Sequence, residues 1–499
     1  MLGADGEVFA GLSPAVSPTY TGNIHPAIHP VTASGASAML DRFPYGKAPL
    51  VLLVVAVLSS LAFAATHQNK RRADLVLAVF AAQHYNAYVA ALPKFEQQHG
   101  IKVDVQRIDF QSLEARLQSA IVSNTEIPDL TEISEGTLGF FTRGPEKDFG
   151  FMDLTDLVQK EGLDHRVVEA RYAPWTARGR VYALPHDVHP VMLAYRRDLV
   201  EQLGIDVSTL ETWDDFIRVG RQITRDADQD GSIDHYMLDL PKNGQWGLQL
   251  LLRQRGVDLF DAQGEVAFNS ALGVDTVLWY LRQTRGPNLI SFDAGEGQPL
   301  AQALRDGLVL FVLTPDWRSW QIQMDAPMLA GKMALMPLPA FEKGGRRTST
   351  WGMTGLTISK ATKHPELAWE LAKFLYFNRE DLGARFAVTN IIPSLKEAWD
   401  LPEFEQPNAY YSGQKVGAEY ARLAPQVPPI FSSAVYKQGQ TKLDEASTRC
   451  AIYYDEHGEQ GLREKVAEEL NQAAAYLKMW SDRNAALARS EPAEGEAGE

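Results

Sequence analysis

The fold of this chain is decided by residues 309–377, in which short apolar runs alternate with turns. The run VLFVL (309–313) has the length of a buried strand, and it leads into TPDWRSW (314–320), a loop that carries one carboxylate and two indoles. A second apolar run, KMALM (332–336), is stopped by PLP (337–339). Short apolar runs bounded by turn residues are typical of strands in the interior of a sheet. We therefore expect two buried strands here, each ending at a loop.

The second half of this stretch predicts a third strand and a helix. After the turn GGRR (344–347), the segment TWGMTG (350–355) leads into the short apolar run LTI (356–358). We expect the helix to begin at Pro365, because a proline in the first turn of a helix loses no backbone hydrogen bond. Apolar side chains then recur at helical spacing along residues 367–375.

This order of elements resembles the bacterial extracellular solute-binding proteins of ABC importers, specifically the sugar-binding family that includes maltose-binding protein. In that family a Trp-bearing loop precedes a strand that ends at PLP, and a helix similar to HPELAWELAKFL (364–375) follows a glycine-rich crossing segment. Further similar pieces are PDL (128–130), GRVYALPHD (179–187), MLAYRRDL (192–199) and TNIIPS (389–394). Arg196 stands where the family usually has Asn, a structural position, so this departure does little to weaken the resemblance.

Length, charge and cysteine content limit the class of protein. With 499 residues, of which 45% are hydrophobic, the chain is long enough for two or more domains with large cores. A net charge of −15 argues against binding to nucleic acid, because that affinity comes mainly from Lys and Arg contacts to phosphate. The single cysteine, Cys450, excludes an intrachain disulfide and a cysteine-rich zinc site, and we interpret it as a small buried apolar residue.

Residues 1–64 are predicted to be a leader. The segment 48–65 has no charged residue, and it ends with the motif AFA (62–64), which matches the cleavage site of a secretory signal. If translation begins at Met39, a charged stretch up to Lys47, the apolar segment and the cleavage site together form a complete signal. The segment predicts export to the periplasm or the extracellular space.

An uncleaved membrane anchor is the alternative for the same segment. Its length is at the lower limit for a membrane-spanning helix. An inner-membrane anchor would leave Lys70, Arg71 and Arg72 on the translocated side, against the usual excess of positive charge on the cytoplasmic side. We therefore favour cleavage over anchoring.

The first part of the mature chain predicts a parallel sheet covered by helices on both faces. Three predicted strands (73–80, 101–105 and 128–134) alternate with two predicted helices (85–99 and 113–122). In sheets of this kind, ligands bind beyond the carboxyl ends of the strands.

The resemblance implies an α/β fold of the periplasmic-binding-protein type, with two discontinuous lobes joined by a hinge of crossing segments. The N-terminal lobe is expected to comprise residues 73–187 and 352–390. The C-terminal lobe is expected to comprise residues 188–351 and 391–482. Residues 485–499 are acidic and are predicted to be a disordered tail.

Candidate ligand-binding residues lie at the predicted strand ends and crossings. A sugar site needs flat aromatic rings to stack on, with polar side chains to bind hydroxyls. The predicted substrate-binding residues are His84, Glu132, Asp187, Trp246, Asp316, Trp317, Trp351, Gly352 and Asn390. Core packing is the alternative for every Trp. The resemblance favours a site role for Trp317 and Trp351, and Gly352 lets the backbone approach a ligand closely.

The segment 226–234 has the carboxylate spacing of a calcium-binding loop. Its carboxylates occupy positions 1, 3, 5 and 9 of such a loop, and a glycine occupies position 6, where the chain must turn sharply. Position 12 should be a bidentate Glu but is Met237. The predicted metal ligands are Asp226, Asp228, Asp230, Ser232 and Asp234. The alternative is a solvated acidic turn; a bound calcium ion would be structural, and no other cofactor is expected.

Motifs of catalysis are missing from the sequence. There is no G-x-S-x-G, G-x-G-x-x-G, Walker loop or H-E-x-x-H, and the 11 histidines show no metal-ligand spacing. We therefore expect a non-enzymatic, monomeric substrate-binding protein that captures a mono- or oligosaccharide and delivers it to the transmembrane subunits of an ABC permease. A membrane-anchored sensing module for a signalling partner is the first alternative, and a secreted glycosidase is the second.

Export gives the first testable prediction. If the chain starts at Met39 and is cleaved after Ala64, N-terminal sequencing of the secreted protein should read ATHQNKRR. A mature protein that keeps residues 48–64 would favour the anchor instead.

The acidic loop gives the second prediction. Removal of calcium should leave the carboxylates of residues 226–234 repelling one another, so the melting temperature should fall with chelator and recover with calcium. Saturation at about 100 times the dissociation constant would add about 2.7 kcal/mol of stability. An unchanged melting curve after chelation would exclude a bound ion.

Overall fold

The chain consists of two compact units, residues 1–71 and residues 72–499. The computed structural model describes residues 48–67, 73–123, 125–226 and 228–489. In the first unit it describes α1 (Ala48–His67), which covers the apolar segment of the predicted leader. No helix within the described ranges has both the length and the apolar character that a membrane crossing requires. Met39 lies outside the described residues, so cleavage and anchoring both stay predictions.

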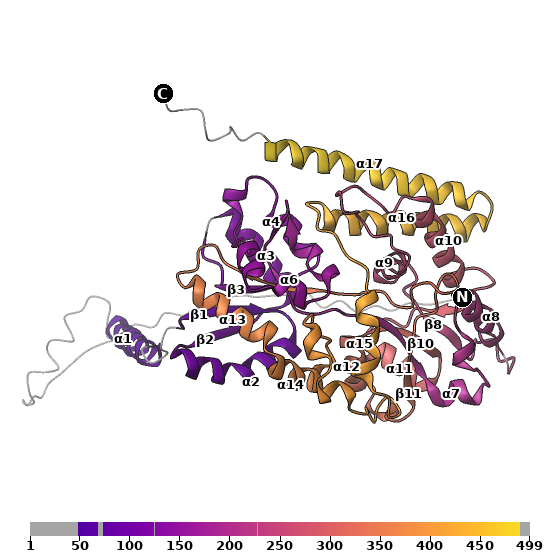
Figure 1. Ribbon diagram of the computed structural model, residues 1–499, viewed down its shortest axis with the longest axis horizontal. Coiled ribbons are helices and arrows are strands. Elements are labelled where there is room, and N and C mark those ends of the chain that lie inside the picture. Colours follow the sequence, from indigo (N-terminus) through magenta and orange to yellow (C-terminus); the bar gives the residue numbers. More distant parts are fainter. Residues whose placement is uncertain (1–47, 68–72, 124, 227, 490–499) are drawn as a thin grey trace, which may run out of the picture. The chain divides into compact units, whose positions relative to one another are not determined.

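The first of two five-stranded sheets in the second unit holds the predicted parallel strands (Figure 1). In spatial order its strands are β2 (Val103–Arg107), β1 (Leu75–Val79), β3 (Leu130–Ser134), β12 (Thr354–Ile358) and β6 (Leu184–Pro185). β1 pairs parallel with β2 and β3, which confirms the expected parallel arrangement. β12 joins the sheet antiparallel to β3 and β6, so the sheet is mixed.

The second sheet contains the two buried strands predicted within residues 309–337. Its order is β11 (Met333–Pro337), β7 (Val191–Arg196), β10 (Val309–Pro315), β8 (Tyr236–Asp239) and β9 (Ser291–Phe292). β10 lies between β7, to which it is antiparallel, and β8, to which it is parallel. Every residue of β7 and β10 is buried, as strands covered on both faces require. A two-stranded ribbon, β4 (Thr176–Ala177) with β5 (Arg180–Val181), completes the described strands.

Helices cover both faces of the first sheet. The helices of this lobe are α2 (Ala82–His99), α3 (Phe110–Val122), α4 (Thr137–Phe141), α5 (Thr155–Lys160), α6 (Leu163–Arg166), α13 (Pro365–Phe377) and α14 (Arg379–Thr389). Leu75, Leu77 and Val79 of β1 share a core with α2 and α13, whereas Ala78 packs with α3 and α4. This alternation is the two-residue period of a strand buried on both faces. α13 begins at Pro365, as predicted.

The second lobe carries the remaining helices. They are α7 (Arg197–Gln202), α8 (Trp213–Ile223), α9 (Gln245–Gln254), α10 (Ala271–Thr284), α11 (Gln298–Asp306), α12 (Asp316–Asp325), α15 (Val416–Leu423), α16 (Tyr436–His457) and α17 (Leu462–Arg489). α16 and α17 pack side by side (Figure 1). α17 runs to Arg489, past the predicted start of the tail at residue 485, and residues 490–499 lie outside the described residues. Cys450 of α16 is buried and unpaired, as expected.

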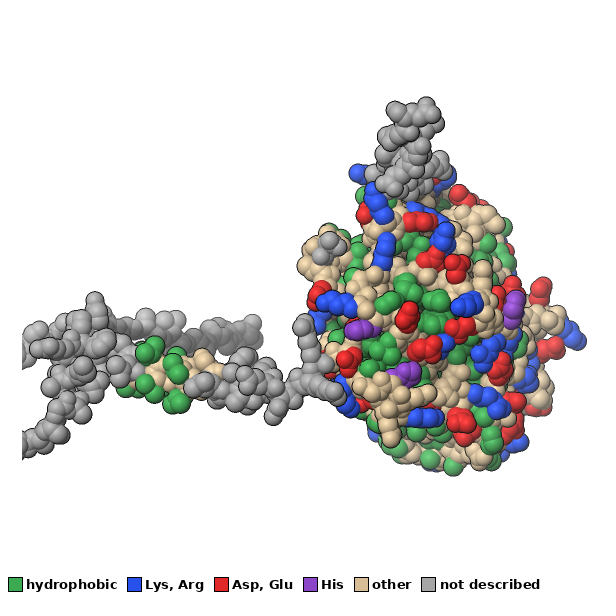
Figure 2. Space-filling model, turned by 60° about the vertical axis from the view of Figure 1, so that its left-hand side comes forward, with side chains coloured by type: hydrophobic (Ala, Val, Ile, Leu, Met, Phe, Trp, Pro, Cys, Tyr) green, Lys and Arg blue, Asp and Glu red, His purple; other side chains and the backbone are tan. Residues whose placement is uncertain are grey.

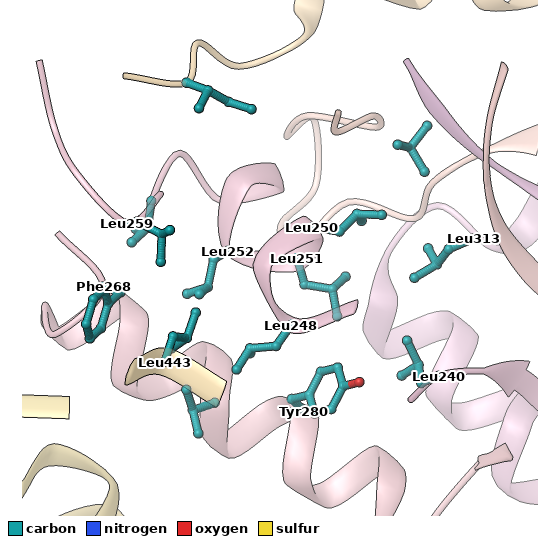
Figure 3. Packing of buried hydrophobic residues seen from close by; sticks show 14 of the residues in the cluster. Leu240, Leu248, Leu250, Leu251, Leu252, Leu259, Phe268, Tyr280, Leu313 and Leu443 are labelled. Atoms are coloured by element: carbon teal, nitrogen blue, oxygen red, sulfur yellow. The ribbon is translucent and has the colours of Figure 1, made fainter. Parts of the chain in front are cut away.

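α9 is fixed in the core of the second lobe by its leucines. Leu248, Leu251 and Leu252 are fully buried beside Tyr280 of α10 and Leu443 of α16 (Figure 3). Burying a leucine side chain contributes roughly 1.5–3 kcal/mol to the stability of the fold. The helix is therefore held firmly, and the side chains on its opposite face have a rigid support.

Acidic and basic side chains are interspersed on the face of the second unit shown in Figure 2. The net charge of −15 is therefore not gathered into one acidic field on that face. A face with this mixture of charges has no evident electrostatic attraction to nucleic acid.

Candidate ligand-binding site between the lobes

Three chain segments cross between the two lobes and lie side by side. The first joins β6 to β7, the second joins β11 to β12, and the third follows α14. Antiparallel bridges pair Asp187 with Pro393 and Pro190 with Thr350, so the first segment contacts both of the others. The predicted crossing residues therefore converge in one place.

His189 is held between two carboxylates at this point. Its Nδ1 lies 2.6 Å from Oδ1 of Asp316, and its Nε2 lies 3.1 Å from Oδ2 of Asp187; all three side chains are buried. The other oxygen of Asp316 accepts the backbone N–H of Ile392 at 2.6 Å. The ring thus joins the first crossing to the start of α12, and Asp316 extends the connection to the third crossing.

The two carboxylates determine the charge of His189. Burial alone would lower the pKa of its imidazole, but Asp187 and Asp316 more than offset this and raise the pKa to about 10. Burial by itself would raise the pKa of Asp187, but His189 and His186 hold that pKa well below its ordinary value. We call His189, Asp187 and Asp316 the clamp. At neutral pH the clamp is therefore an imidazolium between two carboxylates.

Arg171 ties the first crossing to the second. It precedes the ribbon in a short 3-10 turn, η3 (Glu169–Arg171), and it is fully buried. Its Nε donates to the carbonyl of Asp187 at 3.0 Å, and its Nη1 donates to Oγ1 of Thr350 at 3.3 Å. Burial lowers the pKa of this guanidinium to about 10, so the group is still charged at neutral pH.

His84 and Glu132 meet beside the clamp. The Nδ1 of His84 lies 3.0 Å from Oε2 of Glu132, and Oε1 of Glu132 accepts the hydroxyls of Tyr88 and Tyr376 at 2.6 and 3.1 Å. The ring of His84 is 4.1 Å from that of His186. The sequence-predicted residues His84, Glu132 and Asp187 are thus brought together in the buried part of the hinge.

One ligand atom each of His84, His186 and Asp187 lies within 4.8 Å of the others. His186 and Asp187 are neighbours in the chain, but the sequence spacing did not reveal that His84, far earlier in the chain, joins them. Burial and the neighbouring His84 lower the pKa of His186 to about 4, so that ring is neutral, with Nδ1 3.0 Å from Oδ2 of Asp187. Asp187 is already engaged by His186 and His189, and its carboxylate serves as the centre of a hydrogen-bonded network.

Three indoles form a cluster next to the clamp. The rings of Trp246 and Trp351 stack at 3.9 Å with an interplanar angle of 10°. Trp317 meets Trp351 at 5.2 Å and 70°, and its Nε1 donates to the carbonyl of Trp351 at 3.0 Å. All three are partly exposed. Trp317 and Trp351 were predicted to contact a sugar; their planes are nearly perpendicular, so the two rings cannot both lie flat against one sugar ring.

Arg318 packs against the stacked rings of Trp246 and Trp351. Its guanidinium lies 5.1 Å from the ring of Trp246 and 5.0 Å from that of Trp351, at the distance of a cation–π contact. It is buried 3.7 Å from Oδ2 of Asp239. Burial raises the pKa of Asp239 to about 6, although Arg318 opposes that rise.

The cavity beside the stacked indoles is lined by both lobes. Trp246, Gln249 and Arg253 recur at helical spacing on the face of α9 opposite its buried leucines. Gln440 and Asp444 of α16 and Glu135, which follows β3, close the other sides. The cavity volume is about 110 Å³. This is below the range of about 300–1,000 Å³ for small-molecule sites, whose walls are mostly apolar with a few polar groups.

Two glycines allow Glu135 to reach this cavity. A Cβ on Gly136 would lie 2.2 Å from Cδ1 of Tyr436, and one on Gly139 would lie 1.9 Å from the carbonyl oxygen of Ser433. Gly136 also has a φ of 74°, which a side chain disfavours. The start of α4 can therefore pack directly against the start of α16.

Comparison with known proteins agrees with this architecture. The sequence profile described as bacterial extracellular solute-binding protein matches residues 81–380, more than half of the chain.

The chain belongs to the bacterial extracellular solute-binding protein family.

Two arabinooligosaccharide-binding proteins are similar to this chain over most of their length. The arabinooligosaccharide-binding protein of Halalkalibacterium halodurans is 27% identical over 345 residues, which are 68% of this chain and 75% of that protein. The arabinooligosaccharide-binding protein of Bacillus subtilis is 22% identical over 391 residues, which are 77% of this chain and 88% of that protein.

Solved structures confirm the predicted two-lobed fold. The sugar-binding protein MalE from Xanthomonas citri superimposes with a TM-score of 0.66 at 16% identity, covering 82% of this chain and 99% of that one. A cyclo/maltodextrin-binding protein complexed with maltotetraose gives a TM-score of 0.63 at 18% identity, covering 82% of this chain and 98% of that one. Membership of the solute-binding family also confirms that the chain is a binding protein and not an enzyme.

Two further predicted residues of this solute-binding protein stand at the crossings. Asn390 ends α14 in the left-handed conformation (φ 58°), and its Nδ2 donates to Oγ of Ser319 at 3.0 Å. Gly352 has a φ of 86°, and a Cβ there would lie 3.5 Å from both His189 and Trp317. Both residues shape the hinge, and their contact with a ligand stays a prediction.

Sequence reasoning missed the polar side chains that line the cavity and follow no motif: Glu135, Gln249, Arg253, Thr350, Gln440 and Asp444. Gln249 and Arg253 carried a weak signal, because they share a helical face with Trp246, which was predicted. His189, the centre of the clamp, was not among the predicted site residues.

The acidic loop lies outside this site. Carboxylate oxygens of Asp226, Asp228 and Asp234 lie within 4.8 Å of one another, which is close enough for a shared cation. Backbone N–H groups of Asp230 and Gly231 donate to Asp226 at 3.1 and 2.9 Å. The backbone N–H of Ser232 donates to Asp230 at 2.8 Å. These bonds also suit a solvated turn, so calcium binding stays a prediction.

The clamp predicts how stability depends on pH. The folded pKa of His189 is raised, so its contribution is fully present below the unfolded pKa of about 6.5 and is lost as pH rises through about 10. Over that range the free energy of unfolding should fall by up to about 1.4 kcal/mol per pH unit for this proton.

Denaturant unfolding at several pH values measures the effect. His189→Gln should flatten the decline, whereas His165→Gln, at a side chain that is 88% exposed, should leave it unchanged. Equal slopes in the wild type and His189→Gln would show that this imidazole does not carry the charge assigned to it.

Proposed function

We propose that this protein is the substrate-binding component of an ABC importer and that it captures a mono- or oligosaccharide between its lobes. The observation that carries the proposal is the cavity between the lobes, with stacked indoles on one wall and amides, an arginine and carboxylates on the others. Aromatic faces suit the apolar C–H faces of a sugar, and the polar groups suit its hydroxyls. The names of the two relatives support an oligosaccharide as the ligand.

The cavity also explains why binding should close the lobes. Glu135 comes from the first lobe, and Trp246, Gln249 and Arg253 come from the second. A ligand in contact with both lobes stabilises their closed arrangement in proportion to the contacts that exist only when the lobes are together. The closed form would then dock on the transmembrane subunits of the permease, after export of the chain by its N-terminal signal or while held by it as an anchor.

Isothermal titration with arabinooligosaccharides, maltooligosaccharides and galactobiose tests sugar binding. We expect at least one of these sugars to bind with a dissociation constant in the micromolar range or below. Loss of uptake of that sugar after deletion of the gene in the source organism tests the transport role. A folded protein that binds no sugar from such a panel would contradict the proposal.

Truncation of Trp351 should weaken sugar binding without unfolding the protein. Its ring is partly exposed at the cavity, so Trp351→Ala should remove roughly 1–3 kcal/mol of binding free energy, on the scale of apolar burial. This is about 5- to 150-fold in affinity. Trp480→Ala removes an exposed indole of α17 outside the cavity and should leave affinity unchanged. A low melting temperature with normal affinity in Trp351→Ala would make Trp351 a core residue instead.

A further inference from the structure

The carboxylates around the cavity are not balanced by its cations. Among the described side chains that line it, Arg253 is the cationic residue, and Glu135 lines the cavity beside that guanidinium. Asp258 lies behind Arg253, 3.2 Å from its Nε. The charge at this wall is therefore negative even with the guanidinium in place.

Arg253 is already committed to protein partners. Its Nε donates to Asp258, and its Nη2 donates to Oε1 of Glu135 at 3.2 Å and to the hydroxyl of Tyr436 at 2.6 Å. Its Nη1 lies 3.4 Å from the carbonyl of Thr350. One of the five guanidinium N–H groups is left, so Arg253 cannot offer an anion the two parallel N–H groups of a bidentate contact.

The neighbouring cations have carboxylates of their own. Arg318 lies 3.7 Å from Asp239, and Arg171 lies 3.7 Å from Asp187. His189 lies between Asp187 and Asp316. None of these three side chains lines the cavity, and each is neutralised where it stands.

Glu135 retains an acceptor that the protein does not use. Its Oε1 takes the bond from Arg253, but its Oε2 is buried and has no hydrogen-bond partner among the described residues. A buried acceptor without a partner costs free energy, and a hydroxyl brought by a ligand removes that cost. A ligand carboxylate or phosphate at the same place would instead meet a like charge.

We propose that this cavity selects uncharged sugars over their anionic counterparts, such as uronic acids and phosphosugars, and that Glu135 sets this preference by accepting a hydrogen bond from a sugar hydroxyl. The inference rests on the proposed function, because it concerns the ligand of the same site. It adds that the bound sugar is uncharged and that Glu135 determines this preference.

Calorimetric titration with matched pairs of sugars tests the preference. The probes are galactose with galacturonate, glucose with glucuronate, and galactobiose with digalacturonate. A neutral sugar that binds should do so at least about tenfold more tightly than its acid partner, since like charges brought together oppose binding. Equal or tighter binding of the acid would overturn the inference while leaving sugar binding intact.

The variant Glu135→Gln tests whether this residue sets the preference for uncharged sugars. The amide keeps the size of the side chain but removes its charge. The neutral sugar should therefore bind more weakly and the acid more tightly, so the ratio of the two affinities should decrease. A residue with a merely structural role would weaken both partners alike. An unchanged ratio in a variant that keeps its melting temperature would therefore overturn the role of Glu135.

Glu126→Gln is the matched control. Glu126 is exposed and precedes β3, whereas Glu135 follows the same strand, so the two substitutions make the same charge change at opposite ends of one strand. The control should leave the ratio unchanged. A failure of every neutral sugar to bind would contradict the proposed function, and this inference with it.

Discussion

The imidazolium of His189, fixed between Asp187 and Asp316, is the interaction on which the arrangement of the two lobes depends. It connects the first crossing segment to the start of α12, and Asp316 carries the connection to Ile392 in the third crossing. A buried charge is tolerable only where partners neutralise it, and removal of one partner from such a pair typically costs about 3–5 kcal/mol. The clamp therefore holds the crossings in register while the indoles and the cavity lie next to it.

The cavity follows from packing on either side of this clamp. Leucines fix α9 in the core of the second lobe, so that Trp246, Gln249 and Arg253 project from its opposite face. Gly136 and Gly139 let α4 approach α16 closely, and this brings Glu135 from the first lobe to Arg253 in the second. The wall of the cavity thus depends on two features. One is the helical spacing of polar residues on α9, and the other is the close approach of α4 to α16 between the lobes.

The sequence predicted the strands and the helix at Pro365 well, because apolar runs and proline stops are local signals that tertiary structure respects. The two-lobed fold was implied by the resemblance to the solute-binding family. The sequence also named Trp246, Trp317 and Trp351, which the structure gathers into one cluster. It did not reveal the antiparallel return of β12 or the pairing of Glu135 with Arg253, because both depend on contacts between segments far apart in the chain. Nor did it reveal the perpendicular planes of Trp317 and Trp351, since a strand-end position does not fix the orientation of a ring.

The central claim is that a sugar is captured between the lobes, and a distance between the lobes tests it most directly. Nitroxide labels at Lys94→Cys on α2 and Arg218→Cys on α8 would report that distance by pulsed electron spin resonance; both positions are exposed, and the native Cys450 is buried. Addition of a sugar that binds should shift the distance distribution to shorter values and narrow it, as hinge closure requires. A distribution that does not change at saturating sugar would contradict capture between the lobes.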